Sequence, residues 1–129
     1  LAQHRSAKLA ASYAEAAGRQ GKFWEMNDRL FATQSTWTTQ TPAENETYFN
    51  NLAKELALNL TTLQTDLKDP AIMAKITSSY AEGEASGVDS TPTFFLNGVQ
   101  ISNPRSENDF KVLIDALLAS STVATTTAL

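Results

Sequence analysis

The spacing of the apolar residues changes at Thr93. Up to Tyr80, apolar side chains recur three or four residues apart, which is the spacing of amphipathic helices. From Thr93 to Ile101 the residues are β-prone and alternate instead, and Asn97-Gly98 between them is a strong hairpin signal. The chain is therefore expected to be an α/β chain, mostly helical, with a series of helices, a β-hairpin and a last helix.

Capping residues and breaks in periodicity predict where the helices before the hairpin begin and end. Thr41-Pro42-Ala43-Glu44 is a capping box in sequence, and Asp69-Pro70 starts another helix. Thr33–Gln40 lacks apolar periodicity and is expected to be a connection that Trp37 anchors. The expected apolar faces, in helix order, are Ala7, Ala10, Ala11, Ala14 and Ala17; Phe23, Met26, Leu30 and Phe31; Phe49, Leu52, Ala53 and Leu56; Leu60, Leu63 and Leu67; and Ile72, Ile76 and Tyr80.

The carboxyl-terminal part contains the last helix and a low-complexity tail. Ser106 and Asp109 predict the start of this helix. Residues 120–129 are nearly all Ser, Thr and Ala, and we expect a disordered tail there. The sequence thus predicts a helical subdomain over residues 1–87, a second part over 88–119 and the tail. The expected apolar face of the last helix is Phe110, Leu113, Ile114 and Leu117.

The composition argues against several classes of function. The formal net charge is −4 and the basic residues are scattered singly, so nothing favours binding to the phosphates of nucleic acid. The chain has no Cys and a single His, His4, which leaves no thiolate nucleophile, no disulfide and no thiolate or histidine cluster for a metal. We expect no metal and no cofactor. No apolar run reaches the ~20 residues that cross a bilayer, and the amino terminus lacks a signal-peptide pattern.

Two segments carry a specific resemblance to a known family. The first is Gly87-Val88-Asp89-Ser90-Thr91-Pro92-Thr93-Phe94-Phe95-Leu96-Asn97-Gly98. The second runs from His4-Arg5 through Gly21-Lys22-Phe23-Trp24-Glu25-Met26 to Leu30-Phe31. Together they resemble the DsbA-like thiol:disulfide oxidoreductases of the thioredoxin superfamily, over most of the chain. The resemblance implies a partial thioredoxin-like fold, with a DsbA-type helical insertion followed by the hairpin and a carboxyl-terminal helix.

The resemblance also implies a role for Thr91 and Pro92. In that family a cis proline faces the Cys-x-x-Cys across the active site, and the backbone of the preceding residue pairs with an extended peptide substrate. Proline suits such a turn because a cis X-Pro bond costs only ~0.5–1 kcal/mol. The alternative is a trans Pro92 that simply begins the strand, where its missing N–H is tolerated. We expect a cis bond, with Thr91 and Pro92 as substrate-binding residues.

The catalytic half of the family pattern has no counterpart in this chain. The first strand, the Cys-x-x-Cys and the second strand are missing, and disulfide exchange needs a thiolate. The chain alone is therefore expected to be inactive. The resemblance implies oxidoreductase activity outside the cytoplasm for a longer parent, with extended peptides or thiol-containing proteins as substrates. Two alternatives remain open: a DsbA-like glutathione-dependent transferase or isomerase, and a non-catalytic peptide-binding module.

The missing first strand has a consequence for assembly. One edge of Thr93–Leu96 is left without its neighbouring strand, and open apolar edges pair readily with another chain. We therefore expect a homodimer, formed through this edge or through an exposed apolar face.

A few further residues favour structural roles over functional ones. His4 is expected to be an exposed or capping residue, and Trp24 and Trp37 are expected to pack against helices rather than to stack on a ligand. Asn45 and Asn59 begin patterns for N-glycosylation, but such short patterns occur by chance, and we expect no modification.

Overall fold

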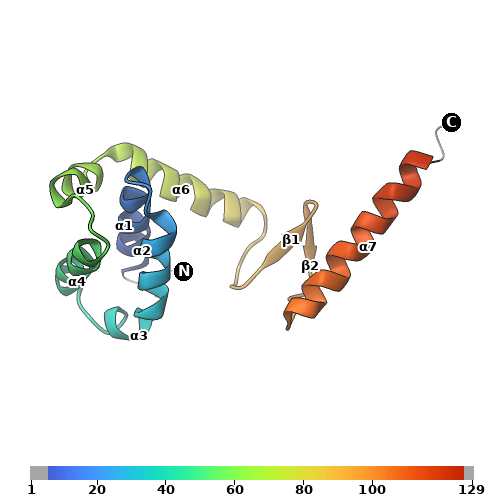
Figure 1. Cartoon of the computed structure of the whole chain (residues 1–129), viewed down its shortest axis with the longest axis horizontal. Helices are drawn as coiled ribbons and strands as arrows, with labels where there is room; N and C mark the ends of the chain where they lie inside the picture. Colours follow the sequence, from blue (N-terminus) through green and yellow to red (C-terminus); the bar gives the residue numbers. More distant parts are fainter. Residues whose placement is uncertain (1–5, 127–129) are drawn as a thin grey trace. The chain divides into compact units, whose positions relative to one another are not determined.

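The computed structural model describes residues 6–126 of the chain. The chain divides into two compact units, Leu1–Ser86, called here the helical unit, and Gly87–Leu129, called the hairpin unit (Figure 1). Most described residues are helical and the two strands form a small antiparallel sheet, which agrees with the expected partial thioredoxin-like fold. The helical unit contains α1 (Ala7–Arg19), α2 (Phe23–Ala32), α3 (Gln34–Trp37), α4 (Pro42–Glu55), α5 (Leu60–Asp66) and α6 (Pro70–Ala85), and the hairpin unit contains β1 (Phe94–Leu96), β2 (Val99–Ile101) and α7 (Glu107–Thr126).

Helices α4 and α6 begin where their capping residues predict. Thr41 Oγ1 accepts a hydrogen bond from the Glu44 N–H at 3.4 Å, and Glu44 Oε2 accepts one from the Thr41 N–H at 2.8 Å, which completes the capping box. Asp69 Oδ1 accepts the Ala71 N–H at 2.9 Å at the start of α6. Asn59 caps α5 in the same way, although the sequence pattern did not indicate it. Main-chain N–H bonds hold the pKa of Glu44 and of Asp69 below their usual ranges.

Phe49 lies at the centre of the hydrophobic core of the helical unit. Its ring meets Tyr13 at 5.3 Å and Trp37 at 5.6 Å between ring centroids, in both cases edge to face. Trp37 therefore anchors the core, as predicted. Small side chains on α1 let neighbouring helices approach, and α1 contacts α2, α4, α5 and α6 (Figure 1). The buried hydrophobic residues are Ala10, Tyr13, Ala14, Ala16, Ala17, Met26, Leu30, Trp37, Phe49, Leu52, Ala53, Leu58, Leu63 and Ile72.

The segment Thr33–Gln40 was expected to be a connection, and this prediction is wrong because it contains the short helix α3. Trp37 gives the physical reason. Its indole Nε1 donates to the Leu30 carbonyl at 2.7 Å, and its side chain is buried. A helical turn brings the indole back to a carbonyl near the end of the preceding helix, so packing of one aromatic residue overrides the polar composition of the segment.

Some residues expected on apolar helix faces are exposed. Met26 and Leu30 define the buried side of α2, and Phe31 is rotated by ~100° from Leu30, which leaves it 67% exposed. Tyr80 is also exposed, since Ile72, near the start of α6, is the buried residue of that helix. In both α2 and α6, the apolar face predicted from residue spacing is therefore wider than the face that is buried.

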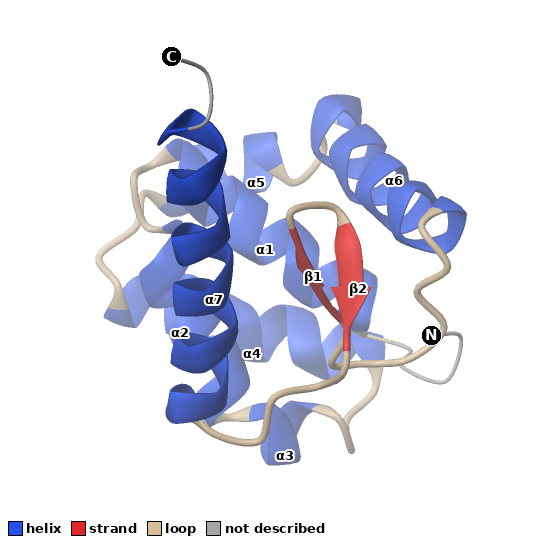
Figure 2. Cartoon of the chain, turned by 90° about the vertical axis from the view of Figure 1, so that its right-hand side faces the viewer, coloured by secondary structure: helices blue, strands red, loops and turns tan. Residues whose placement is uncertain are grey.

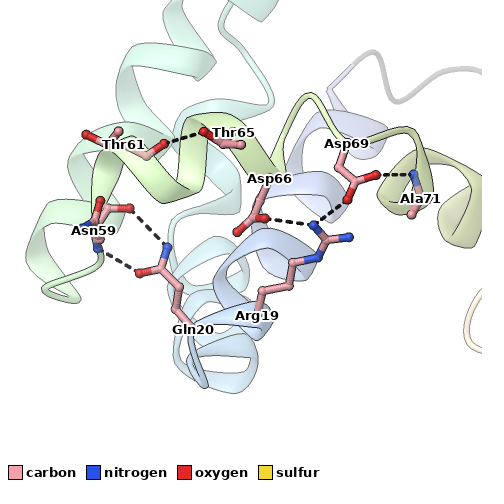
Figure 3. Close-up of polar contacts among 8 residues, drawn as sticks. All are labelled: Arg19, Gln20, Asn59, Thr61, Thr65, Asp66, Asp69 and Ala71. Carbon is pink, nitrogen blue, oxygen red and sulfur yellow. Dashed lines mark hydrogen bonds and ion pairs between the residues drawn. The ribbon is translucent and has the colours of Figure 1, made fainter.

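Polar side chains tie the end of α1 to both ends of α5, as Figure 3 shows. Arg19 Nη1 lies 2.8 Å from Asp66 Oδ1 and 2.7 Å from Asp69 Oδ2. Gln20 Oε1 accepts the Asn59 N–H at 2.9 Å, and Gln20 Nε2 donates to the Asn59 carbonyl at 3.2 Å. Arg19, at the end of α1, and Gln20, which follows it, thus hold the end and the start of α5.

The hairpin unit has the β-hairpin that the sequence predicts (Figure 2). Strands β1 and β2 are antiparallel, with Leu96 opposite Val99 next to the turn. Asn97 has φ 51° and Gly98 has φ 79°, the positive values that a two-residue type I′ turn requires. Phe94 on β1 meets Phe110 on α7 edge to face, with 4.9 Å between ring centroids, so the helix packs on one face of the hairpin.

Helix α7 begins as predicted but ends later. The Asp109 N–H donates to Ser106 Oγ at 3.1 Å, and Asp109 Oδ2 accepts the Arg105 N–H at 2.8 Å. The helix continues to Thr126, past the expected end at Ala119, because neither Gly nor Pro interrupts it there; residues 127–129 lie outside the described residues. Ile114, expected on the apolar face, is 43% exposed, since one residue of rotation carries it away from the hairpin.

Candidate functional site

The candidate site is the loop that leads from α6 into β1. Gly87, which follows the end of α6, has φ 77°, a conformation that stops a helix at little cost only in glycine. The loop then reaches the Thr91–Pro92 peptide bond, which is cis. The prediction of a cis bond at this position is confirmed, and the alternative of a trans proline at the start of the strand is wrong.

Three hydrogen bonds hold the loop in place. Thr93 Oγ1 donates to the Ser90 carbonyl at 2.7 Å, so the two residues that flank Thr91–Pro92 are joined. Asn103 Nδ2 donates to the Pro92 carbonyl at 2.6 Å from the far side of β2. Ser90 Oγ donates to Asp89 Oδ1 at 2.9 Å. The loop is therefore joined to Thr93, just before β1, and to Asn103, two residues after β2.

Asn103 is the residue of this site that sequence reasoning missed. It lies 11 residues after Pro92, and its contact is with a main-chain carbonyl, which leaves no signature in the spacing of side chains. Only the hairpin register could have indicated it, because that register brings the residues after β2 back beside those before β1.

Thr91 presents a free stretch of main chain. Both Thr91 and Pro92 are exposed. Within the part of the chain that the structure describes, neither the N–H nor the C=O of Thr91 takes part in a hydrogen bond. One donor and one acceptor are thus available to an extended peptide laid beside the loop.

The candidate site has no thiol that could act in disulfide exchange. The chain has no cysteine, so no thiolate can attack a disulfide. Among residues 6–126, no three His, Cys, Asp or Glu side chains are grouped so that they could hold a metal ion. What the loop offers chemically is an unpaired main-chain donor and acceptor at Thr91.

The other residues singled out in the sequence are spread over the helical unit. Trp24 meets Phe23 edge to face at 5.2 Å but is 70% exposed, so the expectation that it packs holds only in part. Asn45 is fully buried, and its Nδ2 donates to the Trp37 carbonyl at 2.8 Å, which closes that glycosylation pattern to modification. His4 lies outside the described residues.

A small apolar cavity of about 290 Å³ lies between α1, α2 and α3. Ala10 and Ala14 form one wall, and Leu30, Phe31 and Trp37 form the other. Spacing along the chain does not indicate this cavity, because its lining comes from three separate helices.

Comparison with known proteins places the chain in a family. A family model described as Thioredoxin matches residues 1–116, and the chain therefore belongs to the thioredoxin family. No solved structure matches it.

Among curated proteins, the chain is similar to parts of Na⁺/H⁺ antiporters named NhaA. It is 33% identical over 116 residues to the one from Herminiimonas arsenicoxydans, a match that covers 90% of this chain and 18% of that protein. It is 40% identical over 95 residues to NhaA 1 of Salinispora arenicola, covering 74% of this chain and 14% of the relative. The chain thus spans less than a fifth of the length of these relatives. None of the described helices has the length and apolar character needed to span a membrane.

Proposed function

We propose that this chain is the carboxyl-terminal part of a DsbA-type thiol:disulfide oxidoreductase, in which Thr91 and Pro92 form one wall of the substrate groove. The observation that carries the proposal is the cis Thr91–Pro92 bond beside an unpaired Thr91 main chain. Membership of the thioredoxin family supports the same assignment.

In this mechanism the chain binds the substrate, and cysteines elsewhere in the parent carry out the disulfide exchange. An extended substrate pairs with the N–H and C=O of Thr91, which positions a substrate cysteine across the groove. The parent's Cys-x-x-Cys would be supplied by a segment other than this one: in its reduced form its thiolate would attack a substrate disulfide, and in its oxidised form its disulfide would be attacked by a substrate thiolate. One S–S bond breaks as another forms, and the second cysteine of the pair resolves the mixed disulfide. Pro92 contributes the turn that exposes Thr91, and Asn103 positions Pro92.

The relatives favour a second candidate, in which this thioredoxin-like module belongs to the same polypeptide as a Na⁺/H⁺ antiporter. The support is that the similar proteins carry that name and are more than five times as long as the matched segment. The two candidates are compatible, since a module attached to a membrane protein can still exchange disulfides. By the family resemblance, the module would work on the extracytoplasmic side.

Two other functions make different predictions for the parent. A glutathione-dependent transferase or isomerase would need no cysteine pair and would turn over only with glutathione. A non-catalytic peptide-binding module would keep peptide binding at Thr91 and show no turnover. The sequence upstream of Leu1 and one activity assay separate these cases from the oxidoreductase.

The test is insulin reduction by the parent polypeptide, with this 129-residue chain as the cysteine-free control. We expect turnover by the parent and none by the chain. Pro92→Ala in the parent should lower turnover at least tenfold, whereas Pro70→Ala, at an exposed proline that begins α6, should change it less than twofold. A parent without a Cys-x-x-Cys, or a Pro92→Ala variant with unchanged turnover, would overturn the proposal.

The antiporter candidate has its own test. An antibody against this chain should detect, in cells that carry the gene, a membrane-fraction protein several times heavier than 14.0 kDa. A protein detected only in the soluble fraction would rule the candidate out and leave the oxidoreductase proposal in place.

A further inference from the structure

The turn of the hairpin contains a pair of residues that can react with each other. Asn97-Gly98 is the one place in the chain where a glycine follows an asparagine. The side-chain amide of an asparagine is open to attack by the main-chain nitrogen of the next residue, which makes asparagine a thermolabile residue. The attack is easiest before glycine, because no Cβ shields that nitrogen.

The structure leaves both reacting groups accessible. Asn97 and Gly98 are exposed, in the turn that connects β1 to β2 (Figure 2). Among residues 6–126, no hydrogen bond occupies the side chain of Asn97 or the N–H of Gly98. Apart from the two chain neighbours of Gly98, no residue has an atom within 4 Å of the position that a Cβ would take there. Nothing beyond the turn itself therefore crowds the reacting atoms.

The closed turn has to change before the two groups meet. Asn97 has φ 51° and Gly98 has φ 79°, which is the arrangement of a type I′ turn. Rotation of the peptide plane between the two residues brings the Gly98 nitrogen to the side-chain carbonyl carbon of Asn97. Such a rotation also changes the φ of residue 98, and glycine accepts the change because it lacks a Cβ. The reaction therefore needs a rearrangement of the turn but no unfolding of the chain.

We infer that Asn97 is a site of spontaneous deamidation. The Gly98 N–H gives its proton to hydroxide, and the nitrogen forms a bond to Cγ of Asn97. The Cγ–Nδ2 bond then breaks, the leaving nitrogen takes a proton from water, and ammonia departs, which leaves a cyclic succinimide. One water molecule opens the ring. Addition at Cγ gives a normal aspartate, and addition at the main-chain carbonyl carbon gives isoaspartate, whose main chain runs through Cβ and Cγ.

The two products have different consequences for the hairpin. A normal aspartate keeps the length of the main chain, and Asp-Gly also suits a type I′ turn. Isoaspartate adds one carbon to the main chain of the turn, which displaces the pairing of Leu96 with Val99 next to it. The candidate loop lies at the other end of this hairpin, where Asn103 donates to the Pro92 carbonyl. Isoaspartate therefore weakens the support of that loop.

The test is incubation of the 129-residue chain at physiological temperature and mildly alkaline pH, followed by peptide mass spectrometry with fragmentation that separates aspartate from isoaspartate. Asn97 should deamidate at least about tenfold faster than Asn108, which is also exposed but precedes an aspartate. Asn103 is a second internal control, because the nitrogen of the proline after it carries no hydrogen. Gly98→Ala should slow the reaction at Asn97 by at least about tenfold, although the positive φ of residue 98 strains an alanine and loosens the turn.

Hydrogen exchange of the separated products supplies the second readout. The Val99 amide should exchange at least about tenfold faster in the isoaspartate product than in the fresh chain, and at an unchanged rate in the aspartate product. Asn97→Gly, which keeps a Gly-Gly turn and has no side-chain amide, should stay unchanged over the same incubation. Deamidation of Asn97 no faster than that of Asn108, an undiminished rate in Gly98→Ala, or a fully protected Val99 amide in the isoaspartate product would overturn the inference.

Discussion

The helical unit encloses a hydrophobic core around Phe49, whereas the hairpin unit, which carries the candidate site, buries none of its described side chains. In the helical unit, α1 packs against four other helices and a ring of polar contacts holds α5 at both ends. In the hairpin unit, order comes from turn geometry, the backbone pairing of β1 with β2 and one aromatic pair between β1 and α7.

This difference teaches where stability and recognition reside in the chain. Local opening free energy follows the density of buried contacts, so the helical unit should be the more resistant part. The cis-proline loop lies in the weaker unit and is held by side-chain hydrogen bonds to main-chain carbonyls rather than by burial. A binding loop of this kind depends on its hairpin staying closed.

The largest expected effect comes from removing the aromatic ring of Phe49, at the centre of the core of the helical unit. Phe49→Ala should lower the free energy of unfolding by about 3–5 kcal/mol, because the fully buried ring leaves a cavity among Tyr13, Trp37 and Tyr48. The matched control is Phe31→Ala, at a side chain that is 67% exposed, with an expected change of less than about 1 kcal/mol. Urea unfolding followed by circular dichroism measures both. Equal losses would contradict the placement of the core.

A smaller effect is expected from the one aromatic pair of the hairpin unit. Phe94→Ala should weaken the hairpin by about 1–2 kcal/mol, since the half-buried ring forfeits part of its burial and its contact with Phe110. The amide of Val99 should then exchange with solvent about 5–30 times faster, without a shift in the unfolding of the helical unit. Phe95→Ala, on the opposite face, is the control in dilute solution. A shift in both units together would show that they unfold as one.

The parts of the fold that could be predicted from the sequence are those set by local chemistry. The capping box at Thr41, the cap at Asp69 and the Asn97-Gly98 turn each depend on residues within four positions of one another. Their geometry follows from hydrogen bonds and φ preferences that a short stretch already contains. The cis bond before Pro92 was predicted from a family resemblance rather than from the residue itself.

The parts that could not be predicted depend on contacts between distant positions or on exact rotation about a helix. Helix α3 forms because Trp37 reaches the Leu30 carbonyl, a contact that composition does not indicate. The exposure of Phe31 and Ile114 results from one residue of rotation, about 100°, beyond the apolar face. Asn103 joins the candidate site only once the hairpin register is known.

A change of one helix cap should have an intermediate to small effect. Thr41→Ala should lower the stability of the helical unit by about 1 kcal/mol, because the Glu44 N–H loses its acceptor at the start of α4. For a unit of this size the melting temperature should fall by about 4–8 °C. Thr41→Ser keeps the hydroxyl and should stay close to the wild type. Thermal unfolding by circular dichroism tests the pair, and an unchanged Thr41→Ala variant would rule out a stabilising capping box.

The smallest expected effect is a pH dependence at the junction of α1, α5 and α6. The pKa of the Asp69 carboxyl is lowered, first by the Ala71 N–H and then by Arg19 (Figure 3). The folded state therefore binds a proton at Asp69 less readily than the unfolded state, whose Asp pKa is about 3.9. The stabilisation from this group is present above that pH and is lost as the pH falls through the lower folded value.

Two substitutions separate the two causes. Asp69→Asn keeps an oxygen that can accept the Ala71 N–H but cannot titrate, so stability should fall less steeply than in the wild type as the pH drops below about 4. Arg19→Gln removes the cation and leaves the cap, so the pKa of Asp69 should rise towards its usual value and less stability should be lost than in the wild type as the pH drops below about 4. In about 1 M salt the difference between Arg19→Gln and the wild type should shrink, because screening weakens the exposed ion pair while the hydrogen bond to Ala71 persists.

Urea unfolding at a series of pH values measures how steeply the free energy of unfolding of each protein changes with pH. If both variants follow the wild-type curve, then neither the cap nor Arg19 acts on Asp69, and the ends of α1 and α5 are held together by Gln20 and Asn59 instead.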